Sequence, residues 1–430
     1  MNRRQWLRSA LSAAVSVAVS APRRARSATS ARVVIVGGGF AGSSCALQLR
    51  RLDPALELLL IDPTERYTTC PMSNEVIVGT RPLASLELTR EGLRRAGIRI
   101  VSDRVTRIDP GTRGLQLAGG GHLTYDRLVV APGIRFLWNR IEGLSPQAAE
   151  ELPHAWMAGE QTARLAAQLR SMPDGGVVAI SVPAGPMRCP PAPYERASLM
   201  AHYLKTHKPR SKLLIFDANN YFPKQPQFTD AWTRLYPGLI EWIPMTQDGT
   251  VERVDAHRRI LYTAGAAHRV SVANVIPPQA PSGLAPSVGL AADHGWCPVD
   301  ALTFESTHVP GIHVIGDACI ADAMPKSASA AVSQAAHCAA AIAALLSGRD
   351  PADSAFDSVC YAHVSPSLAL AFPGHFAIRD GRIAAPEPPA TNPTAMAHAT
   401  APTLDVSVAE RDSAAAEQWY AGIRHEAFAL

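Results

Sequence analysis

The 430-residue sequence lacks the cysteine spacings that hold zinc or covalent haem. No two cysteines form a Cys-x-x-Cys pair, so Cys-x-x-Cys-His is absent as well. We therefore expect no metal site and no haem on this chain. The number of cysteines is odd, which leaves at least one outside any disulfide. The seven, scattered singly along the chain, are Cys45, Cys70, Cys189, Cys297, Cys319, Cys338 and Cys360.

Acidic residues are absent from the first 30 positions, which contain six arginines. Arg3-Arg4 precedes an apolar stretch, residues 10–21, that is far shorter than the roughly 20 residues needed to cross a bilayer. This pattern predicts a twin-arginine export signal over residues 1–30 and a periplasmic location, with a retained membrane anchor as the alternative. No later stretch looks long enough either, so we expect no membrane span.

The net positive charge of the chain comes from this leader. Subtracting its six arginines turns the formal net charge of +4 into −2. The rest of the sequence has no Lys/Arg run beside aromatic residues, and we expect no nucleic-acid partner.

A glycine-rich turn follows the first apolar run, residues 32–36. It reads Gly37-Gly38-Gly39-Phe40-Ala41-Gly42, a Gly-x-Gly-x-x-Gly sequence at the start of a helix-like stretch. Glycines allow the backbone N–H groups of Phe40 and Ala41 to approach a pyrophosphate. A second apolar run, residues 58–61, ends in Asp62, placed to bind a ribose. Together they predict a dinucleotide-binding strand–helix–strand unit.

Two further segments indicate FAD rather than a nicotinamide nucleotide. Residues 125–133 read as a strand that ends in Ala131-Pro132-Gly133, like a turn of flavoenzymes with two dinucleotide domains. Residues 311–318 contain Gly316-Asp317, and in those enzymes the corresponding acid holds the ribityl chain of FAD. Another strand–helix–strand pattern, residues 177–217, lies between the two segments.

The order of these segments predicts an α/β fold with two Rossmann-like domains, the second inserted in the first. We expect a split FAD domain over 31–141 and 284–350, an inserted domain over 142–283, and a smaller C-terminal α+β domain over 351–430 that caps the cleft.

The inserted domain lacks the glycines that bind phosphate. Its loop reads Ser181-Val182-Pro183-Ala184-Gly185-Pro186, in which the prolines remove N–H donors. NAD(P)H is therefore not expected as the electron donor. Cys189 follows, before a helix predicted over residues 194–204, whose N-terminus favours a thiolate. A reactive cysteine and a buried structural cysteine in a proline-rich turn are both open.

Four segments together resemble the flavoprotein subunit of flavocytochrome c sulfide dehydrogenase. The related sulfide:quinone oxidoreductases share the general plan but not the Cys-Pro-Pro-x-Pro-Tyr-Glu-Arg loop. Cys319 and residues 375–430 depart from the family pattern. The matching segments are Tyr67–Val76, Cys189–Ser198, Gly295–Asp300 and Met324–Ser327.

The resemblance implies a sulfide dehydrogenase with FAD bonded through its 8α-methyl group to Cys70. It further implies a redox-active Cys189–Cys360 disulfide above the flavin, Glu195 as acid/base and Lys326 near the pyrimidine edge. The partner would be a c-type cytochrome subunit in a heterodimer. The complete set of cofactor-binding candidates is Gly37, Gly39, Phe40, Ala41, Gly42, Asp62, Cys70, Asn74, Ala131, Gly133, Gly316, Asp317 and Lys326.

Three other functions remain open on the sequence. One is a quinone-reducing enzyme, although residues 417–426 have little basic amphipathic character. The others are a Sox-associated flavoprotein that maintains a sulfur carrier, and a non-catalytic subunit that positions a cytochrome. Of the remaining cysteines, Cys45 and Cys338 are expected to be small buried hydrophobes, and Cys297 a structural residue in a turn.

Overall fold

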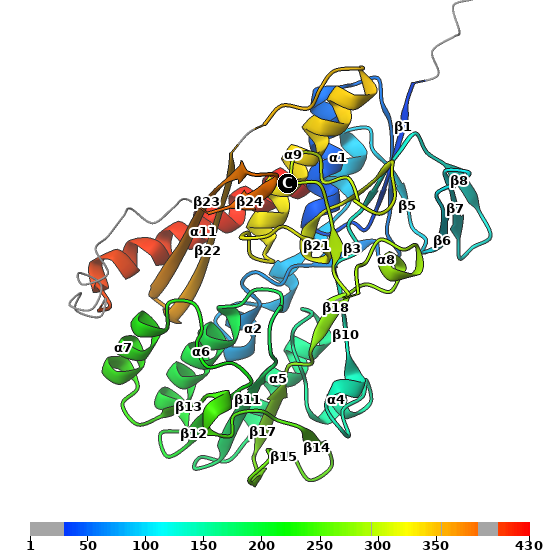
Figure 1. The fold of residues 1–430 in the computed structure, drawn as a ribbon. Helices are drawn as coiled ribbons and strands as arrows, with labels where there is room; N and C mark the ends of the chain where they lie inside the picture. Colours follow the sequence, from blue (N-terminus) through cyan, green and yellow to red (C-terminus); the bar gives the residue numbers. More distant parts are fainter. Residues whose placement is uncertain (1–29, 294, 354, 386–402) are drawn as a thin grey trace, which may run out of the picture. The chain divides into compact units, whose positions relative to one another are not determined.

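The structure, a computed structural model, describes residues 30–293, 295–353, 355–385 and 403–430 (Figure 1). The chain divides into two compact units, residues 1–30 and 31–430, and only the second is described below. The predicted export signal lies outside the described residues.

A five-stranded parallel sheet has the order β20-β9-β1-β2-β5. Its strands read as near-continuous apolar runs because helices cover the faces of a parallel sheet. Helices α1 (Phe40–Leu52) and α9 (Ala328–Leu346) pack against each other through small buried residues. The strands are β20 (Ile312–Val314), β9 (Arg127–Val130), β1 (Arg32–Val36), β2 (Glu57–Ile61) and β5 (Arg99–Val101).

A second parallel sheet has the order β13-β12-β11-β17 and is built from the chain between β9 and β20. The predicted helix over residues 194–204 lies within a longer helix, α6. The sheet contains β11 (Val177–Val182), β12 (Lys212–Asp217), β13 (Ile240–Ile243) and β17 (Val272–Val275), with helices α5 (Glu160–Ser171), α6 (Ala192–His207) and α7 (Gln225–Leu235). The predicted fold class, two Rossmann-like units with the second inserted in the first, is confirmed.

The C-terminal part forms an antiparallel sheet and a long helix. It contains β22 (Phe356–Ser365), β23 (Leu368–Arg379), β24 (Arg382–Ala384) and α11 (Val406–Phe428). Strand β22 lies along α6 and α9, whereas α11 lies along β23 and α1 (Figure 1). Contacts group all of 31–430 into one compact unit, so the domain boundaries at 141, 284 and 350 stay predictions.

Short elements connect these layers. The chain passes between the two parallel sheets at an antiparallel pair, β10 (Ile134–Phe136) with β18 (Gln279–Pro281). The other elements are β3 (Arg66–Thr68), α2 (Ser73–Val78), β4 (Glu87–Thr89), α3 (Glu91–Arg95), β6 (Val105–Asp109), β7 (Gly114–Leu117), β8 (His122–Thr124), α4 (Ala148–Glu151), β14 (Arg253–Asp255), β15 (Ile260–Tyr262), β16 (Ala267–Arg269), α8 (Leu284–Ser287), β19 (Cys297–Pro298) and β21 (Cys319–Ile320), with 3-10 turns at Leu83–Leu86, Trp138–Arg140, Met245–Gln247 and Gly316–Ala318.

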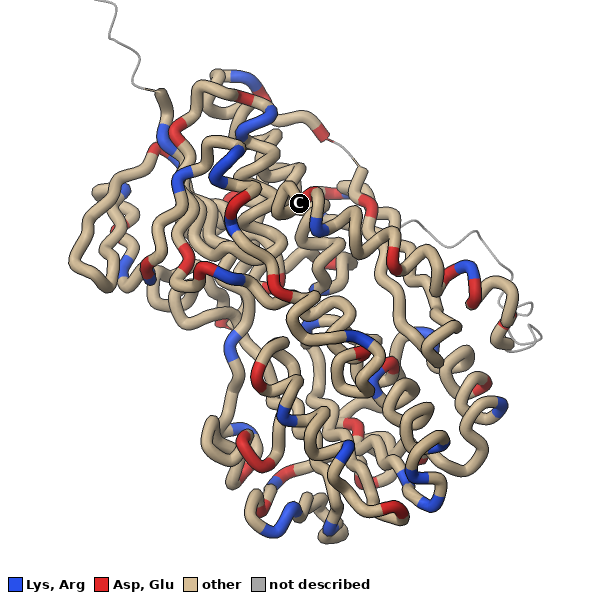
Figure 2. The backbone as a smooth tube through the Cα atoms, turned by 180° about the vertical axis from the view of Figure 1, so that it is seen from behind, with Lys and Arg blue, Asp and Glu red and all other residues tan. Residues whose placement is uncertain are grey.

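Two expectations about surfaces can be compared with the described residues. The first expectation concerns charge, since the sequence has no Lys/Arg run beside aromatic residues. Lys/Arg and Asp/Glu positions are interspersed along the backbone on the side seen in Figure 2. The expectation that no later segment could span a membrane is wrong on length and composition, because α9 is long and apolar enough. Two thirds of that helix window, 67%, is buried inside the protein, as in the core helix of a water-soluble fold.

Gly42 fixes how closely α1 approaches the first sheet. A Cβ atom on this residue would lie 1.9 Å from the carbonyl oxygen of Gly37 and 3.1 Å from the Ile35 side chain. Neither neighbour can move without displacing the loop or the strand. This position therefore requires glycine for packing, as expected for the last glycine of the loop.

We expect Gly42→Ala to lower the free energy of unfolding by about 3 kcal/mol, the upper range of overpacking costs. Gly422→Ala is the matched control, because Gly422 lies exposed in α11 with no atom near the added methyl group. That change should raise stability by about 0.5–1 kcal/mol. Chemical denaturation measures both, and equal effects of the two variants would contradict the packing argument.

Candidate functional site

A cavity of about 500 Å³ lies where the two parallel sheets and the C-terminal part meet. Its wall includes every predicted site residue except Gly42 and Lys326. The predicted residues on the wall are Gly37, Gly39, Phe40, Ala41, Asp62, Cys70, Asn74, Ala131, Gly133, Cys189, Glu195, Gly316, Asp317 and Cys360. Segments more than 300 residues apart in the sequence thus form one site.

The glycine loop forms one end of this cavity. Gly37 has φ +99°, and a Cβ there would lie 2.2 Å from the Ala131 carbonyl oxygen. The backbone N–H of Gly38 donates to Asp62 Oδ2 at 2.7 Å. No side chain caps the N-terminus of α1, so its first N–H groups are free to face a pyrophosphate.

A buried cation lies beside the same loop. Arg90 is fully buried, its Nη2 atom is 3.3 Å from Asp62 Oδ1, and its Nε has no hydrogen-bond partner. Burial lowers the pKa of Arg90, with Asp62 opposing that shift. The loop, the uncapped helix, the acid and this cation together fit the nucleotide end of FAD.

Three cysteines lie on the cavity wall. Cys70 follows β3, and its Sγ is 3.8 Å from the Trp156 carbonyl oxygen. Cys189 precedes α6 with φ +51°, and its N–H donates to the Lys326 carbonyl oxygen at 2.7 Å. Cys360 comes from β22, in the C-terminal part. Two elements far apart in sequence thus deliver Cys189 and Cys360 to one place.

Burial determines the protonation of these thiols. It raises the pKa of Cys189 well above its ordinary value, and Cys360 and Glu195 raise it further, whereas Arg188 lowers it. Burial also raises the pKa of Cys360. Burial thus acts against the thiolate that the helix N-terminus would favour, and whether Cys189 is reactive stays a prediction. Both are free thiols in this structure, and the disulfide stays a prediction.

Glu195 lies in the first turn of α6 and is held by two donors. Its Oε2 accepts from Asn74 Nδ2 at 2.7 Å, and its Oε1 accepts from the backbone N–H of His363 at 3.0 Å. Asn74 in turn accepts from Arg196 Nε at 2.9 Å. The predicted pair Asn74 and Glu195 is thus one hydrogen-bonded unit that joins α2, α6 and β22.

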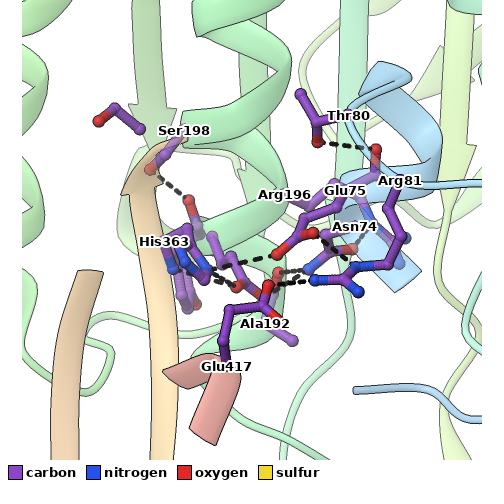
Figure 3. A network of polar contacts seen from close by, with 12 residues as sticks. Asn74, Glu75, Thr80, Arg81, Ala192, Arg196, Ser198, His363 and Glu417 are labelled. Carbon is purple, nitrogen blue, oxygen red and sulfur yellow. Dashed lines mark hydrogen bonds and ion pairs between the residues drawn. The ribbon is translucent and has the colours of Figure 1, made fainter. Parts of the chain in front are cut away.

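Arg196 anchors this unit in the core (Figure 3). Its guanidinium donates to the carbonyl oxygens of His154 and Ala155 at 3.0 and 2.7 Å, and to Asn274 Oδ1 at 2.8 Å. It also lies 5.1 Å from the centre of the Trp156 ring. Burial lowers its pKa to about 10, so the side chain remains a cation at neutral pH.

Asp317 and Lys326 lie in different surroundings, and their predicted roles beside the flavin stay predictions. Asp317 lies on the cavity wall, where burial raises its pKa and Arg188 opposes the shift from 3.9 Å. Lys326 Nζ instead donates to the carbonyl oxygens of Asp317 and Cys319 at 2.9 and 2.7 Å, and lies over Trp296. Its side chain faces a neighbouring cavity of about 560 Å³ that the loop at Gly185 also lines.

The other cysteines are buried away from the cavity. Cys45 and Cys338 lie in α1 and α9, as expected of small buried hydrophobes. Cys297 is not in a turn but in β19, directly opposite Cys319 of β21. Burial raises the pKa of these two thiols to about 11 and about 12. Within the residues that the structure describes, no group of three His, Cys, Asp or Glu side chains is placed to hold a metal.

Sequence reasoning missed several residues of the site. Arg188 and His363 lie on the cavity wall, and Glu75 and Arg81 lie directly behind it. A signal existed for Arg196, which belongs to the quoted Cys-Pro-Pro loop segment. None existed for His363, because nothing in the sequence around it marks which residues of other elements it faces.

Comparisons with known proteins agree with this geometry. A family model described as "Pyridine nucleotide-disulphide oxidoreductase" matches residues 31–169, and one described as "Sulfide dehydrogenase [flavocytochrome c] flavoprotein chain, central" matches residues 162–277. The solved structure of the sulfide:quinone oxidoreductase of Aquifex aeolicus has a TM-score of 0.69, with 18% identity and 93% of both chains covered. The fold and site therefore define a two-domain flavoprotein of the pyridine nucleotide-disulphide oxidoreductase class.

Two curated relatives identify the family more specifically. The sulfide dehydrogenase [flavocytochrome c] flavoprotein chain of Chlorobaculum thiosulfatiphilum is 53% identical over 45 residues, which are 94% of that sequence and 10% of this chain. The mitochondrial sulfide:quinone oxidoreductase of Mus musculus is 24% identical over 316 residues, 70% of this chain and 68% of that protein. The chain belongs to the flavocytochrome c sulfide dehydrogenase flavoprotein family, a family of sulfide-oxidising flavoproteins for which FAD is the implied cofactor.

We expect Arg196→Met to lower the free energy of unfolding by about 3 kcal/mol, because it leaves buried acceptors in three segments without a hydrogen-bond donor. Arg164→Met is the control, since the ion pair of Arg164 in α5 within the described part of the chain is with the exposed Glu160 at 2.6 Å. This control should change stability by less than about 0.5 kcal/mol. Denaturant titration followed by tryptophan fluorescence measures both, and a neutral Arg196→Met would refute the anchoring role.

Proposed function

We propose that this chain oxidises sulfide at a Cys189–Cys360 disulfide, with FAD attached through Cys70, and passes the electrons to a c-type cytochrome subunit. The observation that carries the proposal is the placement of Cys189 and Cys360 on the wall that also holds the glycine loop and Cys70. The family membership supports the sulfide-oxidising part.

The chemistry begins with attack of HS⁻ on one sulfur of the disulfide. The S–S bond breaks, one cysteine becomes a persulfide and the other leaves as a thiolate, so charge and atoms balance. Burial raises the pKa of both thiols, so the freed thiolate takes up a proton unless its electrons move on. Bound FAD would accept the electron pair and release it one electron at a time. Glu195 is the nearest carboxylate placed to take up protons.

A nicotinamide donor is disfavoured by the loop after β11. Prolines at 183 and 186 cannot donate to phosphate, and a single glycine, Gly185, remains of the usual set. The loop leads instead into Cys189, Pro190 and Pro191, which open α6. We therefore infer that sulfide, not NAD(P)H, supplies the electrons.

The acceptor is the finer part of the proposal. Helix α11 buries Tyr420, Ile423 and Phe428 against the body, so these apolar residues are not available to a membrane. This supports a water-soluble cytochrome over a membrane quinone. The similarity to sulfide:quinone oxidoreductases keeps quinone as the second candidate. Sulfide-reduced enzyme mixed with either a c-type cytochrome or a soluble quinone separates the two by which one oxidises it faster.

The proposed location is periplasmic, on the strength of the leader at residues 1–30. Twin-arginine export carries folded proteins, which suits a flavoprotein that acquires its cofactor before export. A covalent link at Cys70 would then prevent loss of the flavin.

We expect Cys70→Ser to bind flavin that acid precipitation releases, whereas the unaltered protein keeps its yellow colour in the pellet. The reason is that serine cannot form the thioether. Cys45→Ala is the control, because Cys45 is buried in α1 away from the cavity. Flavin in the supernatant of the unaltered, matured protein would contradict covalent attachment.

We expect Cys189→Ser and Cys360→Ser each to retain FAD and folding but to lose flavin reduction by sulfide, because neither can form the disulfide that HS⁻ attacks. Anaerobic titration with sulfide, followed by flavin absorbance, measures this, and peptide mapping of the oxidised protein tests the bond itself. Normal turnover by Cys189→Ser, or no linked peptide, would exclude the mechanism. NADH serves as the comparison donor and should leave the flavin oxidised.

A further inference from the structure

His363 lies between two carboxylates that come from different elements (Figure 3). Its Nδ1 atom is 3.5 Å from Glu195 Oε1 and 3.9 Å from Glu75 Oε1. The same nitrogen therefore faces both acids, and a small rotation of the ring changes its partner without a change of tautomer. The side chain is only 5% exposed, and it lies on the wall of the large cavity beside Glu195 and Cys360.

The polar chain continues from Glu75 to the surface. Glu75 Oε2 accepts from Arg81 Nε at 2.7 Å, and Arg81 also binds Glu417 of α11. Figure 3 shows Glu75, Arg81 and Glu417 grouped on one side of His363. Side-chain exposure rises from 14% at Glu75 to 55% at Glu417. The chain thus joins the buried carboxylate beside the cysteines to bulk water.

Sulfide oxidation creates a need for such a chain. If the proposed function is right, each turnover converts HS⁻ to sulfane sulfur, one proton and two electrons. The electrons leave to the one-electron acceptor, and the proton must leave the cavity as well. Glu195 is the group beside the cysteines that can take it, but Glu195 is itself only 16% exposed.

We propose that His363 and Glu75 relay the proton released by sulfide oxidation from Glu195 towards solvent, which Glu75 reaches through its 14% exposed side chain. Glu195 gives the proton to Nδ1 of His363, and the ring passes it to Glu75. The ion pairs of Arg81 hold Glu75 and Glu417 together at the outer end. His363 lies in none of the sequence segments that carry the family resemblance, and Glu75 is next to the predicted cofactor residue Asn74 but was given no role there.

The charges around the imidazole suit this role. Glu195 of α6, Glu75 of α2 and Glu417 of α11 all raise the pKa of His363, and they outweigh the effect of burial. Burial raises the pKa of Glu75, against the opposing effect of Arg81 and His363. Both groups therefore hold a proton more readily than they would in water, and the distances of Nδ1 to the two carboxylates place it to move between them.

The test compares His363→Gln and Glu75→Gln with His375→Gln in the FAD-loaded protein. His375 lies on the neighbouring strand β23 in an exposed pair with Asp357, so it controls for loss of a histidine–carboxylate pair. We expect the first two variants to lower kcat about tenfold or more with little change in KM, and to enlarge the solvent deuterium isotope effect. His375→Gln should change neither. Glu75→Asp, which keeps a carboxyl group, should recover part of the rate.

The outcomes separate the relay from the proposed function. If the unaltered protein does not reduce its flavin with sulfide, both ideas fail. If it does, and His363→Gln keeps its kcat and isotope effect, only the relay is overturned. Should His363→Gln not fold, Glu75→Gln provides the second test, and an unchanged kcat and isotope effect there would equally overturn the relay.

Discussion

The site depends on one buried cation, Arg196. Its guanidinium links the inserted sheet through Asn274, the segment before α5 through His154, and α2 through Asn74. Because Arg196 follows Glu195 directly and lies seven residues after Cys189, fixing it fixes the whole start of α6. A buried charge is tolerated only when its hydrogen bonds are satisfied. The hydrogen bonds that satisfy the Arg196 guanidinium therefore also fix where Glu195 and Cys189 lie.

Electrostatics inside the cavity follow from that placement. Arg188 and Asp317 oppose each other, and Glu195 faces His363, so the described charges of the wall occur largely in opposed pairs. In a medium of low dielectric constant, an unpaired charge would cost far more than in water. A reaction that creates anionic sulfur here must therefore move protons together with electrons, which is why acid–base partners next to the cysteines matter as much as the cysteines.

Much of the fold could be predicted because its signals are local. Apolar runs, the loop at Gly37–Gly42 and the two later turns each lie within about ten residues, and the order of these segments gives the inserted arrangement. Cys189 stood out from its loop, whereas its pairing with Cys360 and the role of Glu195 came only from the resemblance. His363 could not be found, because its partners Glu195 and Glu75 lie 168 and 288 residues away along the chain. The contacts of Lys326 could not be predicted either, because its ammonium group donates to backbone carbonyls, which the sequence does not display.

In the loop after β11, the same residues that are unsuited to phosphate binding also fix the backbone at Cys189. Prolines before and after Cys189 remove phosphate donors, and they also restrict the backbone on both sides of a left-handed residue. The backbone N–H of Cys189 donates to the carbonyl oxygen of Lys326, and this hydrogen bond fixes the turn further. A disulfide needs its two Cβ atoms at a narrow separation. A flexible glycine loop could bind a dinucleotide but would leave the position of the Cys189 sulfur poorly fixed. The proline-rich loop lacks the phosphate donors but restricts where that sulfur lies.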